Sequence, residues 1–288
     1  MRERLEQVGT MFSAGYHVAL EDGDPADLER ELQGLPSECR GFAFEGAAMA
    51  LALLDALTPW RGDRIRQFLG GPGEPHCYMV HVGVGWAWAR LPLKNVARAR
   101  RQLDPMLQWL ALDGYGFHEA FFNWPSTIDG KPPPSKLTGY ERRAFDQGFG
   151  RCLWFVDGGD VELIPCTIAG FGVERQPDLW SGVGLAATYA GGVSLAALRE
   201  LRRAAGSYQP QLAQGSAFAA KARQRAGNST EATDLATGVL CEMAAMDAAK
   251  ITDRALENLP SDSMEPGFEL WRKRIQNHFH KEFQLQEK

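Results

Sequence analysis

Residues 41–60, with the sequence GFAFEGAAMALALLDALTPW, decide the fold class. Alanine and leucine favour a helix along this stretch, and Pro59 marks its end. Between Phe42 and Leu54 the only charged residue is Glu45, so the helix is apolar on every side. Such a helix normally lies at the centre of a protein, where other helices cover it. The stretch therefore predicts a helical protein whose interior contains this segment.

Helical signals also dominate the rest of the chain. Asp24 fits the N-cap and Pro25 the first turn of a helix over 24–36. No repeat of fixed period is evident. The other segments of helical composition are 104–125, 140–159, 178–192, 194–206, 209–227, 230–259 and 267–283. We therefore predict one mainly helical domain over residues 1–288, with C-terminal helices over 229–288.

Two segments do not follow this pattern. In 77–90, CYMVHVGVGWAWAR, large and small residues alternate in β-favouring types, which is typical of a strand. A lone strand has no partner in a helical chain, so we favour a buried helix and keep a short β segment as the alternative. The segment 126–139, rich in proline and glycine, predicts an exposed and poorly ordered loop, either a lid or a hinge.

Charge and cysteine content argue against several classes of function. The 288 residues carry a formal net charge of −5, whereas a protein that binds nucleic acid would need a basic face. The five cysteines are odd in number and form no CxxC pair, so neither a disulfide framework nor a zinc knuckle is indicated. Reduced cysteines fit a cytoplasmic protein, and we expect that location.

Targeting signals and common catalytic motifs are missing from the sequence. The first residues, MRERLEQVGTMF, lack a long apolar core, so we expect no signal peptide. The most apolar run, GAAMALALLDAL, is short and contains Asp55, so we expect no membrane span. GxGxxG, Walker, GxSxG and HExxH patterns are absent, which argues against phosphate cofactors and nucleophilic hydrolysis.

Glu45 and His81 stand alone in apolar segments. A buried carboxylate without a partner is costly, so Glu45 must be protonated, paired or bound to a metal. It serves either a core ion pair or chemistry. His81 is either a satisfied core residue or a ligand-binding one, because Gly83 and Gly85 leave room beside it. We expect both residues to be buried, with Arg143, Asp146 or Arg151 facing the same cavity.

Two further segments carry candidate polar residues. In 112–124, LDGYGFHEAFFNW, they are Asp113, His118 and Glu119; the alternative is a helix kink loosened by glycines. In 143–154 a second set recurs at helical spacing and forms one face. That face either contacts a ligand or pins neighbouring helices through an Arg–Asp–Arg network. Its members are Arg143, Asp146, Gln147, Gly150, Arg151 and Trp154. A glycine inside a helix suggests that a ligand or another backbone packs closely at Gly150.

Six blocks in this order resemble one protein family. They are GFAFEGAAMALALLD, HVGVGWAWARL, LALDGYGFHEAFFNW, RRAFDQGFGRCLWFVDGGD, DLWSGVGLAATYAGG and LAQGSAFAAKARQRAGN, between residues 41 and 228. They are similar to the domain-of-unknown-function family 1702, whose members accompany enediyne polyketide synthases. The resemblance implies a pathway and an apolar linear polyene, or a molecule derived from it, as the ligand. It implies no catalytic residues.

Two functions are compatible with these features. The first is an enzyme of enediyne core formation that uses oxidative or acid–base chemistry. Its candidate catalytic residues are Glu45, His81, Asp113, His118, Glu119, Arg143, Asp146 and Arg151. Candidate substrate-binding residues are Trp86, Trp88, Gln147, Gly150, Trp154 and Trp180. Inward carboxylates and imidazoles in a helical bundle can hold non-haem iron, although the usual Glu-x-x-His pair is absent. The metal-ligand candidates are Glu45, His81, His118, Glu119 and Asp146.

The second function is a non-catalytic protein that shields or delivers the apolar polyene. It needs an apolar cavity but no converging acid and base. A third hypothesis is a scaffold that binds the polyketide synthase or other pathway proteins through the terminal helices. The sequence also leaves a homodimer open.

Overall fold

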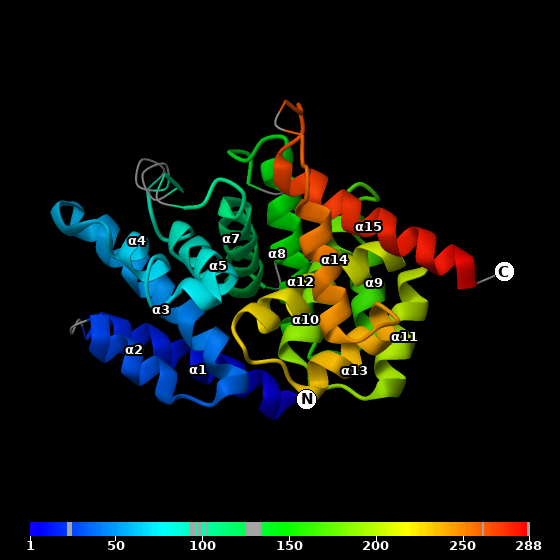
Figure 1. Ribbon diagram of the computed structural model, residues 1–288, viewed down its shortest axis with the longest axis horizontal. Coiled ribbons are helices and arrows are strands. Elements are labelled where there is room, and N and C mark those ends of the chain that lie inside the picture. The colour runs from blue at the N-terminus through cyan, green and yellow to red at the C-terminus, as the bar shows by residue number, and fades with distance from the viewer. Residues whose placement is uncertain are drawn as a thin grey trace.

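The fold is helical throughout the part of the chain that the structure describes. The computed structural model describes residues 1–21, 25–92, 96, 100–101, 103–124, 134–260 and 262–286. Within these residues all regular structure is helical and forms a single domain (Figure 1). The same residues include no helix long and apolar enough to cross a membrane. The predicted fold class is therefore confirmed.

The described helices differ in length. The longer ones are α1 (Arg2–Leu20), α2 (Pro25–Gly34), α3 (Ser37–Leu57), α5 (Cys77–Trp88), α7 (Gln108–Phe122), α8 (Tyr140–Val156), α10 (Gln176–Ala190), α11 (Leu195–Ala205), α12 (Gln209–Arg225), α13 (Glu231–Leu240), α14 (Ala245–Leu256) and α15 (Gly267–Gln286). The shorter ones are α4 (Arg64–Leu69), α9 (Leu163–Ala169) and the 3-10 turns η1 (Pro59–Arg61), η2 (Glu74–His76) and η3 (Gly206–Tyr208).

Seven helices form a series in which each packs against the next. The order of packing is α1, α3, α5, α7, α8, α10 and α12, with α14 and α15 packed on α12. Figure 1 shows the same progression, from the N-terminal helices at one side to the C-terminal helices at the other. Helices that pack against each other in this series are also close together along the chain. The interior is therefore built mainly from contacts between successive helices.

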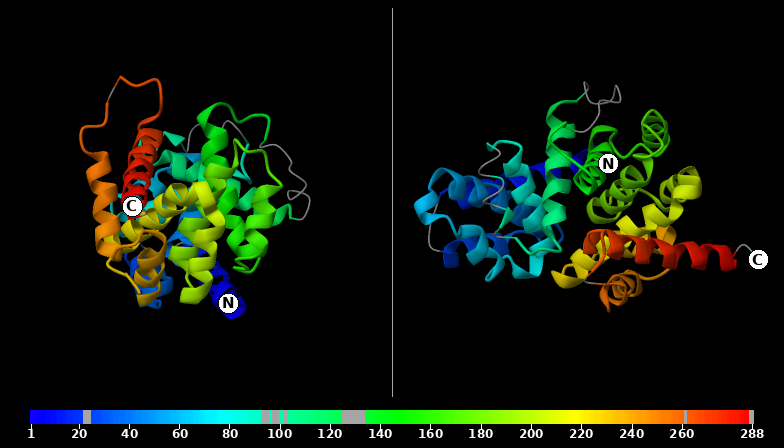
Figure 2. Two further views of the ribbon diagram at one scale, coloured as in Figure 1. Left: turned by 90° about the vertical axis from the view of Figure 1, so that its right-hand side faces the viewer. Right: turned by 90° about the horizontal axis from the view of Figure 1, so that it is seen from above.

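The series bends until helices from its two ends meet. Arg4 of α1 donates a hydrogen bond from Nε to the carbonyl oxygen of Ala190, at the end of α10, over 2.9 Å. The buried Arg223 of α12 donates from Nη1 to the carbonyl oxygen of Glu38 in α3, over 2.6 Å. In the right-hand view of Figure 2 the N-terminus lies about midway along the long axis of the molecule, and in the left-hand view it lies at the edge. These contacts enclose a space between α1, α3 and the ends of α7, α8 and α10.

Pairs of glycines allow neighbouring helices to approach until backbone meets backbone. A Cβ atom on Gly85 would lie 1.9 Å from the carbonyl oxygen of Ala111, and one on Gly114 would lie 2.0 Å from that of Val82. No side chain fits in such a gap. The same reciprocal contact joins α1 to α3 (Gly15, Gly46), α7 to α8 (Gly116, Gly148), α8 to α10 (Gly150, Gly182) and α10 to α12 (Gly184, Gly215). Between α3 and α5 the contact is one-sided and uses Gly83.

All of these glycines except Gly15 belong to a short motif that recurs in six helices. Its first glycine is Gly46, Gly83, Gly114, Gly148, Gly182 or Gly215, and a second small residue follows two positions later. The spacing between successive motifs varies from 31 to 37 residues. The pattern therefore has no fixed period, because the connections differ in length while the motif itself stays constant. We call it the glycine motif.

Each glycine motif presents two side chains on one face of its helix. One residue immediately precedes the first glycine and the other lies three positions after it, so the two are four residues apart and point the same way. In chain order these pairs are Glu45 and Met49, Val82 and Trp86, Asp113 and Phe117, Gln147 and Arg151, Ser181 and Leu185, and Gln214 and Phe218. The glycine contacts bring these pairs close together across the series.

Several local predictions can now be compared with the structure. Within the segment 77–90, Cys77–Trp88 form the buried helix α5, so the β alternative is wrong; α3 and α7 cover both sides of this helix. The predicted helix 230–259 is two helices, because the chain turns between Leu240 and Ala245. Residues 126–133 of the predicted loop and the candidate N-cap Asp24 lie outside the described residues. In the described part of the loop, 134–139, Leu137 is buried.

The glycine contacts make a direct prediction for stability. A Cβ on Gly148 would lie 1.7 Å from the carbonyl oxygen of Asp113, and backbone cannot rotate away. We expect Gly148→Ala to lower the free energy of unfolding by about 3 kcal/mol or more. A Cβ on Gly238 in α13 would meet no atom within 4 Å. There the same substitution should raise stability by up to about 1 kcal/mol, because alanine favours helix. Urea unfolding of both variants measures this, and equal effects would contradict it.

Candidate functional site

A cavity of about 670 Å³ lies between α1, α3, α5, α7, α8 and α10. Most of its wall is aromatic or aliphatic. The aromatic side chains come from six different helices and include Phe12, Phe42, Trp86, Phe117, Phe155 and Tyr189. Their rings contact one another, as between Trp86 and Phe117 with centroids 5.1 Å apart. The helices thus form an apolar container whose volume is that of a small-molecule site.

The glycine motif places part of this wall. Trp86, Phe117, Arg151 and Leu185 all occupy the position three residues after the first glycine, in four successive motifs, and all line the cavity. The close backbone contacts of α5, α7, α8 and α10 bring these four positions together. This part of the inner surface of the cavity is therefore a consequence of the glycine motif.

The cavity opens to solvent at one end. Phe121 and Phe122, at the end of α7, line it and are 42% and 54% exposed. Arg2 and Glu6 of α1 also line it, and they form an exposed ion pair with each other at 2.7 Å. These residues form a mouth that an apolar molecule can reach from outside. Glu45 and Arg151 lie at the buried part of the cavity, each less than 10% exposed.

The buried part of the cavity contains a group that we call the polar cluster: Glu45, Arg151 and Asp113. Arg151 Nε lies 2.7 Å from Asp113 Oδ1, whereas its Nη2 lies 4.0 Å from Glu45 Oε1. Asp113 is therefore the closer partner of the cation. Glu45 Oε1 accepts a hydrogen bond of 3.0 Å from the indole N–H of Trp86. Arg151 also lies over the ring of Phe117, 5.1 Å from its centroid, a favourable cation–π position.

Burial changes the protonation of Glu45. Loss of solvation raises the pKa of this carboxyl to about 7, although Arg151 and the Trp86 N–H act in the opposite direction. Burial also raises the pKa of Asp113, and Arg151 and Gln147 oppose that shift. Because Asp113 holds Arg151 at the shorter distance, we assign the negative charge of the cluster to Asp113. Glu45 then exchanges its proton near neutral pH.

A line of buried polar contacts runs from Asp113 through the interior. Gln147 donates to Asp113 Oδ2 over 2.8 Å, and Ser181 lies within hydrogen-bond distance of both Gln147 (3.3 Å) and Gln214 (2.9 Å). Each of these four residues immediately precedes the first glycine of its motif. Arg272 of α15 continues the line, because its Nε donates to Gln214 Oε1 over 3.2 Å. The line thus links the polar cluster to the C-terminal helix.

Arg272 also belongs to a second buried ion network. It donates to Asp178 Oδ1 over 2.8 Å and lies 3.6 Å from Glu269 Oε2. Arg143 pairs with the same two carboxylates, bonding to Asp178 Oδ2 over 2.9 Å. This candidate residue therefore lies at the α8–α10–α15 junction and not at the cavity. Its partners Asp178 and Glu269, and the second cation Arg272, were not identified from the sequence.

The other charged candidates are also separate from the cavity. Asp146 makes a bidentate pair with Arg175, at 2.6 and 3.0 Å, and burial raises its pKa to about 6. His81 is buried as expected, but its Nδ1 faces the Cys77 carbonyl at 2.6 Å and its Nε2 accepts from Asp104 N–H at 3.3 Å. His81 is therefore absent from the wall of the cavity that Glu45 lines.

His118 and Glu119 flank the cavity wall without lining it. The ring of His118 packs edge-to-face on Trp86, with centroids 5.6 Å apart, behind the cavity surface. Its Nδ1 lies 3.5 Å from Glu119 Oε1. Asn123 donates to the carbonyl oxygen and the carboxylate of Glu119 near the surface. Both residues thus belong to the packing of α7.

Four predicted substrate-binding residues have other positions. Trp88, Trp154 and Trp180 are buried in the core outside the cavity wall. Gly150 contacts backbone, because a Cβ there would lie 2.1 Å from the Leu179 carbonyl oxygen. Of the predicted set, Trp86 lines the cavity and Gln147 stands behind the polar cluster. The polar face of 143–154 therefore joins several helices through ion pairs and hydrogen bonds. Of its residues, only Arg151 lines the cavity.

The candidate metal ligands do not converge. Among the described residues, no three side chains of His, Cys, Asp or Glu are grouped so that they could hold a metal ion. His118 and Glu119 lie next to each other, whereas Glu45, His81 and Asp146 each have other partners. The non-haem iron considered from the sequence therefore has no set of ligands among them.

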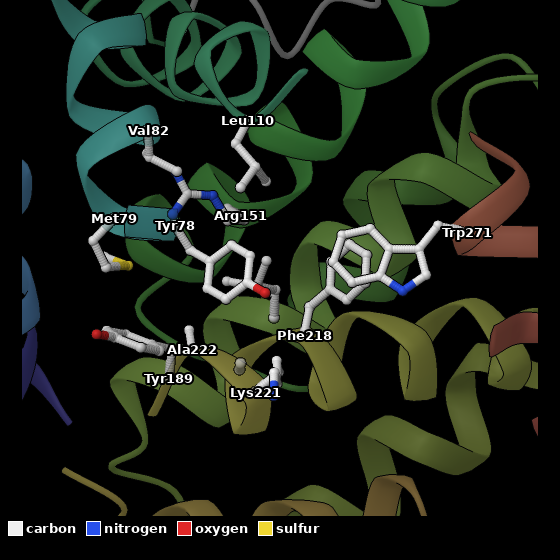
Figure 3. Close-up of a pocket in the computed structure, with 12 residues that line it drawn as sticks. Tyr78, Met79, Val82, Leu110, Arg151, Tyr189, Phe218, Lys221, Ala222 and Trp271 are labelled. Atoms are coloured by element: carbon white, nitrogen blue, oxygen red, sulfur yellow. The ribbon is translucent and has the colours of Figure 1, made fainter. Parts of the chain in front are cut away.

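A much smaller pocket lies on the other side of Arg151, Leu185 and Tyr189, which line both spaces. Its volume of about 30 Å³ suits a single water molecule. Figure 3 shows Tyr78 reaching toward Phe218 and Trp271 in this pocket, while the Tyr189 hydroxyl points away from it. The small pocket is too confined for the ligand that the large cavity would hold.

The sequence did not reveal α1 as a wall of the site, nor Phe42, Phe155 and Tyr189. One signal was available: Phe121, Phe155 and Tyr189 each lie four residues beyond the cavity-facing position of their motif. Alignment of the glycine motifs would have placed them on the cavity face. No comparable signal marks α1.

Glu45 should give the protein a specific dependence of stability on pH. The pKa of its carboxyl is ordinarily 4.5 and is about 7 in the folded state. Between these values the native state keeps a proton that the unfolded chain has released, so the free energy of unfolding falls as pH rises. The slope is at most roughly 1.4 kcal/mol per pH unit, and it vanishes above the folded pKa. Glu45→Gln removes this contribution.

We therefore expect Glu45→Gln to gain stability relative to the parent protein as pH rises from about 4.5 to about 7. Urea unfolding of both proteins across this range gives the difference, in which other titrating groups cancel. Parallel stability curves would show that Glu45 does not hold a proton in the folded state.

Comparison with known proteins identifies the family. The family model described as "Protein of unknown function (DUF1702)" matches residues 1–279 of the 288. The match extends beyond both ends of the region 41–228 that carried the resemblance. No curated protein and no solved structure matches the chain. The chain belongs to the DUF1702 family of proteins of unknown function.

Proposed function

We propose that this protein binds a linear polyene, or a molecule derived from it, in the large cavity during enediyne-type polyketide biosynthesis. In this proposal Glu45 transfers a proton to or from the bound molecule. The observation that carries it is the aromatic cavity of about 670 Å³ with Glu45 and Arg151 in its buried part. The pathway rests on the resemblance described from the sequence.

The shape and lining of the cavity support an apolar, unsaturated ligand. Aromatic rings of Phe12, Trp86 and Phe117 lie in contact along one wall, with centroid distances of 4.6 and 5.1 Å. Conjugated chains have flat π-systems that pack on such rings as other aromatics do. The exposed Phe121 and Phe122 at the mouth extend the apolar surface to solvent. A long chain would thus be covered along much of its length.

The polar cluster supports acid–base chemistry. A carboxyl whose pKa is about 7 can both donate and accept a proton at neutral pH, which suits a general acid or base. Arg151 lines the same cavity and would stabilise negative charge that develops nearby. Asp113 keeps the cation in place at 2.7 Å. Glu45 is therefore the proposed catalytic residue and Asp113 a positioning residue.

The alternative is a carrier that shields the polyene without changing it. The apolar wall alone is enough for retention, and Trp86 already engages Glu45 through a hydrogen bond of 3.0 Å. The two functions share the cavity and differ in whether the proton of Glu45 is needed.

Filling the cavity should abolish binding in either case. Ala186 lines it and is 3% exposed, so Ala186→Phe would place a ring inside the space. We expect diphenylhexatriene, a conjugated hydrocarbon that fluoresces in apolar surroundings, to bind the parent protein and to bind Ala186→Phe at least roughly tenfold more weakly. Ala196→Phe, on the exposed side of α11, is the matched control and should bind normally. Equal fluorescence for all three proteins would refute the cavity as the binding site.

Product formation in a strain that carries an enediyne cluster separates enzyme from carrier. If Glu45 transfers a proton, both Ala186→Phe and Glu45→Gln lower the product output, and Glu45→Gln does so while still binding diphenylhexatriene. If the protein is a carrier, only Ala186→Phe lowers it. Protein level and melting temperature of each variant control for folding. Normal output from Ala186→Phe would contradict both functions.

A further inference from the structure

Hydrogen-bond donors exceed acceptors around the polar cluster. Asp113 Oδ2 accepts from Gln147 at 2.8 Å, and Asp113 Oδ1 lies 2.7 Å from Arg151 Nε in an ion pair that lacks hydrogen-bond geometry. Glu45 Oε1 accepts from Trp86. Within the described part of the chain, Arg151 Nη2 is buried without a hydrogen-bond acceptor, and so is the hydroxyl of Tyr189, another cavity-lining residue. A buried donor without a partner is unfavourable, so an acceptor supplied by a ligand would be favoured here.

The charge of the cluster is balanced without a ligand. Arg151 and Asp113 form one cation–anion pair, and a protonated Glu45 adds no charge. A bound carboxylate would add a second negative charge beside Asp113. A bound ammonium group would lie beside Arg151. Either would be an unpaired charge in a place that is more than nine-tenths buried, which is costly. An uncharged group avoids this cost.

We propose that the bound molecule carries an uncharged oxygen acceptor, such as a ketone or another carbonyl, which accepts hydrogen bonds from the carboxyl of Glu45 and from Arg151. The proposal rests on the proposed function, because it assumes that the apolar chain lies in the large cavity. It adds the chemistry of the polar end: a neutral carbonyl at the polar cluster and a hydrocarbon chain toward the mouth.

The surroundings of Glu45 define how this binding depends on pH. The groups that face it are Arg151 from α8, Asp113 from α7 and Tyr189 from α10, with Trp86 from α5 as an uncharged donor. The Arg2–Glu6 ion pair of α1 lies at the mouth. Burial raises the pKa of the Glu45 carboxyl to about 7, so this group loses its proton near neutral pH. The carbonyl should therefore bind best below the pKa of about 7 and lose one donor above it.

Four probes with chains of equal length test the proposal on the full-length protein: methyl undecyl ketone, tridecane, tridecanoic acid and tridecylamine. Each displaces diphenylhexatriene in a competition assay. At pH 6 we expect the ketone to bind roughly tenfold more tightly than tridecane, since one or two hydrogen bonds are gained. The acid and the amine should bind more weakly than the ketone. At pH 8 the advantage of the ketone over tridecane should shrink.

Glu45→Gln separates this inference from a general effect on folding. Glutamine keeps an acceptor for the Trp86 N–H and offers an N–H donor that does not titrate. We expect the variant to retain the advantage of the ketone at pH 6 and to keep it unchanged at pH 8. Tyr208→Phe, on η3 away from the cavity, is a control that should behave as the parent protein does.

The outcomes distinguish the two proposals. If tridecane and the ketone bind equally at both pH values, or if the acid or the amine binds most tightly, the neutral-acceptor inference is wrong while the apolar cavity stands. If neither they nor diphenylhexatriene bind, the proposed function itself fails. If the advantage of the ketone depends on pH in Glu45→Gln as in the parent, Glu45 is not the donor and the inference is overturned.

Discussion

The contact of backbone with backbone at the glycine motifs is the constraint on which the rest of the structure depends. Where a carbonyl oxygen occupies the place of a Cβ atom, as that of Val82 does at Gly114, two helices have no side chains between them and their spacing is fixed. Contacts of this kind recur from α1 to α12. A change in the spacing of two helices at one contact would therefore shift every later helix of the series. The same closeness brings the residues on either side of each glycine pair within reach of one another. Polar side chains as short as Ser181 can then span from helix to helix.

A buried polar line is costly unless every member finds a partner. In this protein each partner comes from the neighbouring motif. Gln147 donates a hydrogen bond to Asp113, and Ser181 lies within hydrogen-bond distance of Gln147 and Gln214. These contacts form only when the helices are in this order and register. They therefore favour one arrangement of similar, alanine-rich helices over others with comparable apolar burial. The same contacts between neighbouring motifs therefore stabilise the polar cluster and select this arrangement of the helices.

Composition and local pattern were sufficient to predict the helical fold and the burial of Glu45, because an apolar helix leaves no route to water. They were not sufficient to predict which buried residues meet. His81 and Glu45 both stand alone in apolar helices, yet His81 bonds to Cys77 and Asp104 while Glu45 faces the cavity. A polar residue that stands alone in an apolar segment is expected to be buried, but the pattern does not show toward which neighbour its side chain points. Asp178 and Arg272 pair across 94 residues of chain, and no local pattern relates them.

The site lies where one glycine motif differs from the other five. In five of the six glycine motifs, the residue three positions after the first glycine is apolar: Met49, Trp86, Phe117, Leu185 or Phe218. In the motif of α8 it is Arg151, and this places a buried cation on an otherwise apolar inner face. A cation there requires a counter-charge, which Asp113 supplies from the preceding motif at 2.7 Å. That pairing leaves Glu45 without a close cation, so burial raises the pKa of its carboxyl to about 7. The presence of Arg151 at one glycine motif, and its pairing with Asp113 from the preceding motif, thus explain why Glu45 titrates near neutral pH inside an apolar cavity.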